Sequence, residues 1–167
     1  GFSVIPVYLR SKQPRIKWGK YQKQLPTHGE LIRWFRVPSN GAVVTGTNNL
    51  VVIDFDTISD YVQWSLWAVD GPQPARIILR DAYKVRTSRG VHVYTRVSSK
   101  MRNMHFGNID IKAWGGLVTL PGSIHPSGAI YTEYGGDSFP VWSDLTDVFP
   151  SWMVMEEKVK IVGRKEV

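Results

Sequence analysis

An unbroken apolar run from Leu50 to Ile53 ends in two carboxylates, Asp54 and Asp56, which are separated by a single aromatic residue. Such a run is typical of a strand buried on both faces, where aspartate is rare because burying its charge is costly. Side chains two positions apart on a strand share a face, so Asp54 and Asp56 project together, with Val52 behind them. We therefore expect a core strand whose end carries an acidic pair.

This acidic pair has two interpretations. Two carboxylates at this spacing repel each other, and a divalent cation that uses both as ligands removes the repulsion. Alternatively, the two residues merely end the strand, and an isolated Asp-x-Asp is more often of that kind. Because the apolar run buries the base of the strand, the carboxylates are expected at its mouth.

A second strand pattern, over residues 109–114, carries one more acid. Ile109 and Ile111 face one way, and Asp110 and Lys112 face the other. A third carboxylate from a neighbouring strand would complete a site for two cations, which can hold the attacking and leaving oxygens of a phosphoryl transfer. Lys112 either pairs with Asp110 or binds a phosphate, and the sequence does not choose between these roles.

A third polar motif lies between the two acidic segments. Ser88, Arg89 and Gly90 form a small turn whose backbone amides can approach an anion. His92 follows on a strand, either as a packed structural residue or as a phosphate contact. Arg86 and Arg89 are either phosphate ligands or ordinary surface charge, and we favour Arg86 as the ligand.

The composition restricts which metals and partners the chain can use. It contains no cysteine and four histidines, which excludes disulfides and thiolate metal sites. Carboxylates favour hard cations such as Mg²⁺ or Mn²⁺. The net charge of +7 suits a polyanionic partner such as nucleic acid or nucleotides, although solubility alone explains it equally well.

The length and hydropathy indicate one folded domain. The 167 residues, 43% of them hydrophobic, suffice for a core, and no apolar run approaches the ~20 residues of a membrane span. No signal-peptide pattern is visible, so the cytoplasm is the expected compartment. Gly1 is not a natural start, and we expect residues 1–167 to be a single domain excised from a longer protein.

The order of helix and strand patterns predicts an α+β fold with largely antiparallel sheets. Thr27 and Glu30 form a capping box before a helix over 28–36, and a second helix is expected over 57–69. A turn is expected at 125–128, and a helix interrupted at Pro150 over 144–160. The expected strands are 2–7, 41–46, 50–56 after a turn at 48–49, 75–80, 83–87, 91–96, 109–114, 117–120 and 129–134.

Three motifs, in this order, resemble those of the archaeo-eukaryotic primase superfamily. The similar branch is the bifunctional primase–polymerase (prim-pol) domain of plasmid, phage and mobile-element replication proteins. VVIDFD (51–56) resembles its acidic first motif, SRGVH (88–92) its Ser-x-Gly-x-His motif, and NIDIKAW (108–114) its hydrophobic residue followed by Asp. The segments around these motifs are also similar, so the resemblance covers roughly residues 1–135.

This resemblance implies a fold and an activity. The fold is a mixed α/β module packed on an RRM-like catalytic sheet, with the active-site cleft between them. The activity is template-directed nucleotidyl transfer, which makes or extends primers from NTPs or dNTPs on single-stranded DNA. By the motif match, Asp54, Asp56 and Asp110 hold two Mg²⁺ or Mn²⁺ ions: one lowers the pKa of a primer 3′-hydroxyl, and the other stabilises the pyrophosphate.

The resemblance also assigns the nucleotide site. Ser88, Gly90 and His92 are implied to bind the incoming triphosphate, with Arg86 or Lys112 adding positive charge. A family-like turn, LPGSIHPSG, contributes two further candidates. These are Ser123 and His125, which either support the nucleotide or only shape the hairpin.

A basic segment near the N-terminus is the expected template contact. Its candidate phosphate ligands are Lys12, Arg15, Lys17 and Lys20. Trp18 or Tyr21 would stack on a base. The alternative, that Trp18 is a core residue and the lysines belong to a solvated loop, is at least as well supported. Trp64 and Trp67, in the second helix, are expected in the core.

The family pattern differs from this chain at both ends. The family usually has more chain before residues 1–7, and priming in this branch commonly involves a helical domain after the catalytic one. We therefore expect fusion to C-terminal helical or helicase domains, a cytoplasmic role in phage, plasmid or mobile-element replication, and an isolated domain that extends primers while priming poorly.

Two other function classes compete with this interpretation. A metal-dependent nuclease also uses acidic clusters and a basic surface, but it needs an activated water rather than a triphosphate pocket. A non-catalytic nucleic-acid-binding module explains the net charge. It does not explain three carboxylates at strand ends, which would repel phosphates unless cations intervene.

Overall fold

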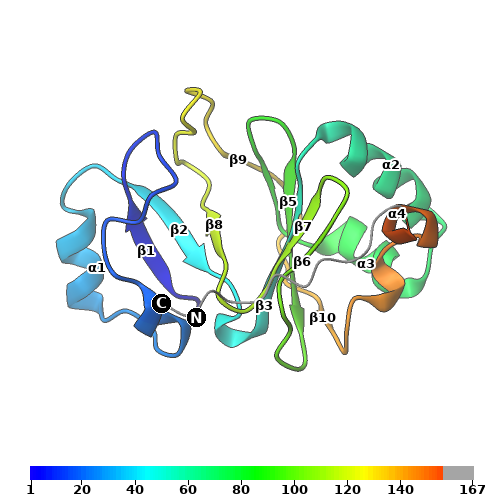
Figure 1. Ribbon diagram of the computed structural model, residues 1–167, viewed down its shortest axis with the longest axis horizontal. Helices are drawn as coiled ribbons and strands as arrows, with labels where there is room; N and C mark the ends of the chain where they lie inside the picture. The colour runs from blue at the N-terminus through cyan, green and yellow to red at the C-terminus, as the bar shows by residue number, and fades with distance from the viewer. Residues whose placement is uncertain (156–167) are drawn as a thin grey trace.

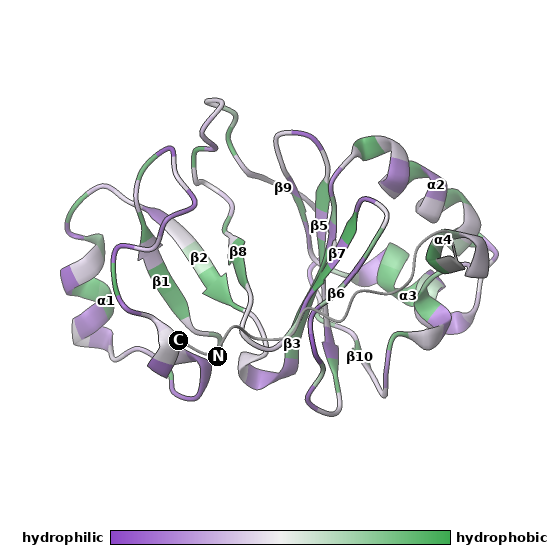
Figure 2. Cartoon of the chain, in the orientation of Figure 1, coloured by the Kyte–Doolittle hydropathy of each residue, from purple (hydrophilic) through white to green (hydrophobic). Residues whose placement is uncertain are grey.

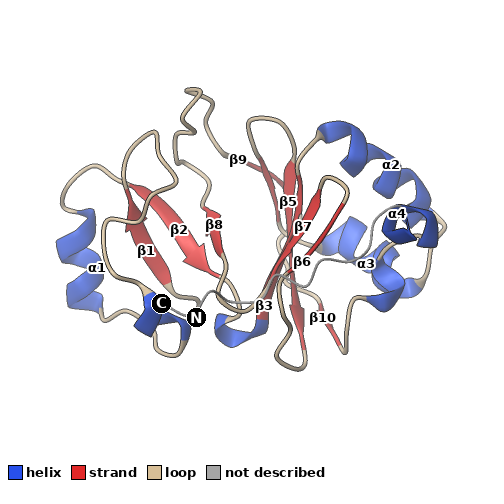
Figure 3. Ribbon diagram, viewed as in Figure 1, coloured by secondary structure: helices blue, strands red, loops and turns tan. Residues whose placement is uncertain are grey.

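The computed structural model describes residues 1–155 and arranges them in four layers (Figure 1). A helix, a small sheet, a large sheet and a group of helices follow one another across the molecule (Figure 3). Each interface between neighbouring layers contains its own cluster of buried apolar side chains. The expected α+β class is confirmed.

The small sheet has three antiparallel strands in the order β1-β2-β8. Its strands are β1 (Val4–Val7), β2 (Asn40–Val44) and β8 (Leu117–Thr119). Helix α1 (His28–Phe35) and the 3-10 turn η1 (Gly19–Gln22) cover its outer face. The predicted capping box is present, because Thr27 accepts from the amide of Glu30 and the Glu30 carboxylate accepts from the amide of Thr27.

The large sheet has seven strands and is antiparallel except where β10 pairs with β5. Its path is β6-β7-β3-β5-β4-β9, and β10 joins β5 in parallel. Figure 2 shows hydrophobic residues along these strands. The bounds are β3 (Leu50–Phe55), β4 (Lys84–Arg86), β5 (Val91–Val97), β6 (Met104–Phe106), β7 (Ile109–Lys112), β9 (Thr132–Gly135) and β10 (Val141–Trp142).

Helices cover one face of the large sheet. They are α2 (Ile58–Val69), α3 (Gln73–Asp81), the 3-10 turn η3 (Thr146–Val148) and α4 (Ser151–Met155). Trp64 of α2 is fully buried there, and its indole N–H donates to the Val148 carbonyl at 2.7 Å. The prediction that Trp64 and Trp67 belong to the core is confirmed, although Trp67 is only partly buried.

Residues 75–80 form part of α3, so the predicted strand there is wrong. Ala75 and Ile78 are buried and Leu79 packs against the same core, which is the i, i+3, i+4 spacing of a helix face. Pro74 stands in the first turn, where its missing N–H costs nothing. The high strand propensity of Ile-Ile-Leu concealed this spacing.

The remaining differences concern short elements. Strands β6 and β10 were not predicted, because each is too short to show a period in the sequence. The turn at 125–128 is present, closed by a bond from the His125 amide to the Ala129 carbonyl at 2.7 Å. At the C-terminus, η3 and α4 flank Pro150 as expected, and residues 156–160 of the predicted helix lie outside the described residues.

The face of the large sheet that turns toward the small sheet positions the polar motifs. Val52 of β3 and Tyr94 of β5 pack on this face against Val43 and Val118 of the small sheet. Asp54 shares the face of Val52 because it lies two residues further along β3. The acidic end of β3 therefore emerges where the apolar contact between the two sheets ends.

Candidate active site

Strand pairing brings two of the acids together. Asp54 of β3 is directly opposite Asp110 of β7, and on its other side it is opposite His92 of β5. Directly opposed residues share a face, with Cβ atoms about 4.5–5.5 Å apart. Asp56 follows β3 immediately, and its amide donates to the Asn108 carbonyl at 2.9 Å, beside β7. The fold thus gathers the acids that the sequence separates.

Burial and mutual repulsion make this acidic group electrostatically unfavourable. Burial raises the pKa of Asp54 to about 6, and the charge of Asp110 adds to the rise while Lys112 opposes it. Burial also raises the pKa of Asp56, together with the charges of Asp54 and Asp110. Two of the three acids are therefore costly to ionise, mainly because they are buried, and such perturbed carboxyl groups are common at functional sites.

Asp110 differs from the other two acids because both of its oxygens have partners. Lys112 Nζ lies 2.6 Å from Oδ2, and His105 Nδ1 lies 2.6 Å from Oδ1. Burial pushes the pKa of Asp110 upward, but these two hydrogen bonds outweigh it and lower the pKa. His105 belongs to β6 and was missed in the sequence, where only its place between Met104 and Phe106 hinted at a strand.

His92 is buried beside Asp54. Its Nε2 lies 3.4 Å from Asp54 Oδ1, and only 6% of the residue is exposed. Burial lowers the pKa of His92 to about 3, so the ring is neutral at physiological pH and the contact is not an ion pair. Its Nδ1 has no hydrogen-bond partner among residues 1–155. The Tyr131 ring, 5.9 Å away between centroids, supports the imidazole.

Gly90 is explained by close packing rather than by an anion. A Cβ at this position would lie 1.7 Å from the Phe55 carbonyl oxygen, so only glycine lets the turn pass the end of β3. The Gly90 amide already donates to the Thr87 hydroxyl at 2.9 Å. The neighbouring Ser88 is half-buried. In this conformation, therefore, the Gly90 amide of the predicted turn is not free to bind a phosphate.

The two arginines of this motif differ in their relation to Asp54. Arg86 of β4 is opposite Val91 of β5, and Val91 belongs to the core beneath the helices. Because opposed residues share a face, the Arg86 side chain leaves the sheet away from Asp54. The charge of Arg89, in contrast, lowers the pKa of Asp54. The predicted ligand Arg86 thus faces away from the acids, whereas the charge of Arg89 reaches Asp54.

The hairpin candidates have separate roles. The Ser123 hydroxyl accepts from the Gly41 amide at 3.1 Å and is 4% exposed, so it ties the hairpin to β2. His125 is half-buried, and its Nδ1 accepts from the Ser127 amide at 3.1 Å. Burial, with the charges of Lys12 and Arg89, lowers the pKa of His125. His125 thus lies within electrostatic reach of the motifs, whereas Ser123 shapes the hairpin.

The basic N-terminal segment is partly committed to the fold. Arg15 donates to the Ser39 hydroxyl, Lys20 pairs with Glu30 at 3.3 Å, and Trp18 packs against the outer core of the small sheet. Tyr21 is buried, which removes it as a stacking residue. Lys12 and Lys17 remain exposed as candidates. The charge of Lys12 lowers the pKa of Asp54, which places this loop near the acids.

The chain matches the sequence model of the bifunctional DNA primase/polymerase N-terminal domain, Prim-Pol, over residues 1–152. This chain belongs to the Prim-Pol family. The matched region includes all three motifs and the N-terminal lead-in, so the resemblance seen in the motifs is confirmed and extends further. No curated protein matches the chain.

The Prim-Pol acids have the chemistry that divalent cations need. Three carboxylates at the end of β3 and on β7 share one region, and two of them have raised pKa values, mainly because they are buried. Within residues 1–155, no three histidine or acidic side chains converge into a ready-made cation cluster. Carboxylate oxygens are the ligands that Mg²⁺ and Mn²⁺ prefer, but Asp110 would have to exchange its present partners before it could share a cation with the other two acids.

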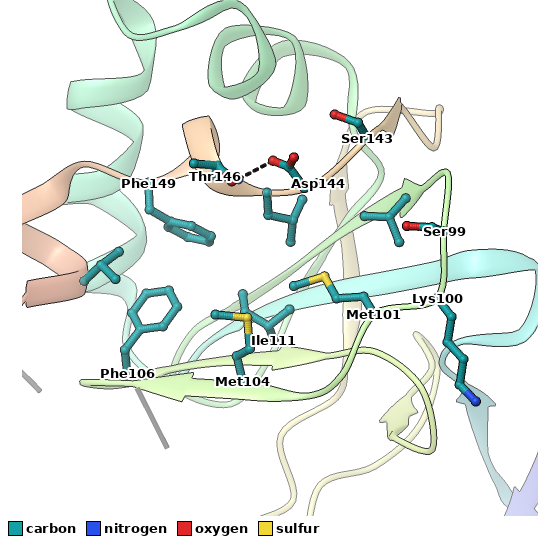
Figure 4. A pocket seen from close by; sticks show the side chains of 13 residues that line it. Ser99, Lys100, Met101, Met104, Phe106, Ile111, Ser143, Asp144, Thr146 and Phe149 are labelled. Atoms are coloured by element: carbon teal, nitrogen blue, oxygen red, sulfur yellow. Dashed lines mark hydrogen bonds between the residues drawn. The ribbon is translucent and has the colours of Figure 1, made fainter. Parts of the chain in front are cut away.

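A separate hollow of about 460 Å³ lies on the helix-covered side of the Prim-Pol sheet (Figure 4). Met101, Met104, Phe106 and Phe149 line it, and Ile111 of β7 forms part of its wall. Since Ile111 alternates with Asp110 and Lys112, the hollow and the acids are on opposite faces of β7.

No helix within the described residues is long and apolar enough to cross a membrane.

Proposed function

We propose that this Prim-Pol domain transfers nucleotides from dNTPs or NTPs to a primer 3′-hydroxyl, or to an initiating nucleotide, on a single-stranded DNA template. The observation that carries the proposal is the pairing of Asp54 with Asp110 across β3 and β7, with Asp56 next along the chain. Family membership supplies the chemical class, and the pairing supports a common site for the three acids.

Asp54, Asp56 and Asp110 would hold two Mg²⁺ or Mn²⁺ ions. When bound, these ions would lower the pKa of the primer hydroxyl and neutralise the pyrophosphate leaving group. The raised pKa of Asp54 supports this role, because a carboxylate that is costly to ionise alone gains most from a cation.

The incoming triphosphate needs cationic and neutral donors near the acids. Arg89 and Lys12 carry charge within reach of Asp54, and His125 lies in the field of both. The neutral ring of His92 can donate a hydrogen bond without adding charge. Arginine suits the task because its planar fork binds phosphate oxygens in pairs. This set supports a nucleotide at the acidic end of β3.

The template strand is assigned to the exposed side chains of the N-terminal segment. Lys12 and Lys17 can follow phosphates, since neither is committed to a bond within the described residues. Lys12 is a candidate both for the template phosphates and for the incoming triphosphate, because its charge reaches Asp54. Lys17 is therefore the cleaner probe of template binding.

A nuclease is the main competing enzyme class, and a primer-extension assay separates the two. The domain is incubated with a primed single-stranded template, Mn²⁺ and all four dNTPs, and then with NTPs. We expect the primer to lengthen, and Asp54→Asn to abolish lengthening while DNA binding changes little. Asp137→Asn is the matched control, because it makes the same change at an exposed acid outside the three motifs. Primer shortening, or full activity in the Asp54 variant, contradicts the proposal.

A further inference from the structure

Lys112 carries a positive charge that contacts one of the acids directly. It follows Asp110 by two positions on β7 and is directly opposite Val52, so it shares the face of Asp54 and Asp110. Its Nζ lies 2.6 Å from Asp110 Oδ2, and its side chain is 30% exposed. Lys112 therefore occupies one of the two Asp110 oxygens that a cation would need as ligands.

The second oxygen of Asp110 is also in use. His105 Nδ1 lies 2.6 Å from Oδ1, so this carboxylate is held from both sides. The charge of Lys112 extends to Asp54, whose ionisation it favours. A divalent ion that joins the acids would meet this positive charge at short range, and like charges at that distance repel strongly in a partly buried site.

We propose that Lys112 is an internal counter-ion: it neutralises Asp110 in the cation-free domain and leaves Asp110 when Mg²⁺ or Mn²⁺ binds. This inference depends on the proposed function, because it concerns the same cation site. Once released, the flexible lysine side chain can reach a phosphate. Lys112 would thus first pair with Asp110 and then bind a phosphate, which are the two roles that the sequence left open. His105 keeps Asp110 oriented while its partner changes.

Mn²⁺ binding in the absence of nucleotide tests the exchange. Isothermal titration compares the wild-type domain with Lys112→Met, which keeps the length of the side chain and removes the charge. We expect Lys112→Met to bind Mn²⁺ at least about tenfold more tightly, because the competing charge is gone. Unchanged or weaker binding in this variant overturns the inference.

Two control variants separate direct competition from general charge. Lys17→Met removes the same charge at an exposed position without a bond to an acid, and its Mn²⁺ affinity should stay within about twofold of wild type. Arg89→Met removes a charge that acts on Asp54 without a bond to Asp110. It should tighten Mn²⁺ binding less than Lys112→Met does. Equal tightening in both variants overturns direct competition.

A second measurement uses only the wild-type protein. Acetylation of lysine amines is followed by mass spectrometry, first in a chelator and then in saturating Mg²⁺. The Lys112 amine should become more reactive in Mg²⁺, because it is no longer bonded to Asp110, whereas Lys17 should not change. Unchanged reactivity of Lys112 in a domain that binds the ion overturns the inference alone. Absence of ion binding in wild type and in Lys112→Met overturns the proposed cation site as well.

Discussion

Replacement of Gly90 by alanine tests whether close packing fixes the turn at the centre of the second motif. Gly90 has a backbone conformation that alanine can adopt, so only space is at issue. The added Cβ would lie 1.7 Å from the Phe55 carbonyl oxygen and 2.9 Å from the Asp56 carbonyl carbon. Both atoms belong to the backbone at the end of β3, which a side-chain rotation cannot move.

The size of the effect follows from the displacement required. Real Cβ atoms essentially never lie closer than 3.0 Å to another heavy atom, so the turn or the end of β3 must move by at least 1.3 Å, the difference between 3.0 and 1.7 Å. Overpacking by one methyl group typically costs about 1–3 kcal/mol, and more when backbone must shift. We expect a loss of about 3 kcal/mol in the free energy of unfolding. For a domain of this size, that lowers Tm by roughly 6–12 °C.

Thermal unfolding followed by circular dichroism measures the effect in the metal-free domain. Gly29→Ala is the matched control: Gly29 lies in α1, nothing lies within 4 Å of its added Cβ, and alanine favours the helix. Its Tm should be unchanged or slightly raised. A Gly90→Ala variant that melts within about 1 °C of wild type would refute the packing explanation and restore flexibility or anion binding as the reason for this glycine.

Two further predictions concern charge. The folded pKa of Asp54, about 6, lies above its ordinary value of 3.8, so its ionisation costs stability above pH 6 and that cost fades as the pH falls toward 4. This difference in pKa corresponds to a cost on the order of 3 kcal/mol in the free energy of unfolding. Asp54→Asn should therefore stabilise the metal-free domain by up to that amount at about pH 7.5 and by less at about pH 5. Urea unfolding in a chelator measures this, and a variant less stable than wild type at both pH values would count against buried charge at Asp54. Arg89→Ala should weaken dNTP binding in Mn²⁺ by about tenfold or more, whereas Arg86→Ala, on the other face, should leave it within about twofold; isothermal titration gives both values, and the reverse order would reject the assignment of Arg89.

Local signals in the sequence were sufficient for much of the fold. The capping box at Thr27 predicted the start of α1, because its two hydrogen bonds involve only neighbouring residues. The alternation of Asp110 with Ile109 and Ile111 predicted which face each residue takes, because that depends only on the pleat of one strand. Residues 75–80 show the limit: strand propensity and helical spacing conflicted, and packing against the sheet decided for the helix.

Which residues meet was decided by the tertiary structure. The sequence determined the family, the acidic motifs and the face of each motif residue, because these depend on residue type and on spacing along one segment. Strand order determined that Asp110 lies opposite Asp54, that His105 of an unpredicted strand holds Asp110, and that Arg86 points away from Asp54. Strand order depends on contacts between segments far apart in the chain, and such contacts leave no periodic trace in any one segment.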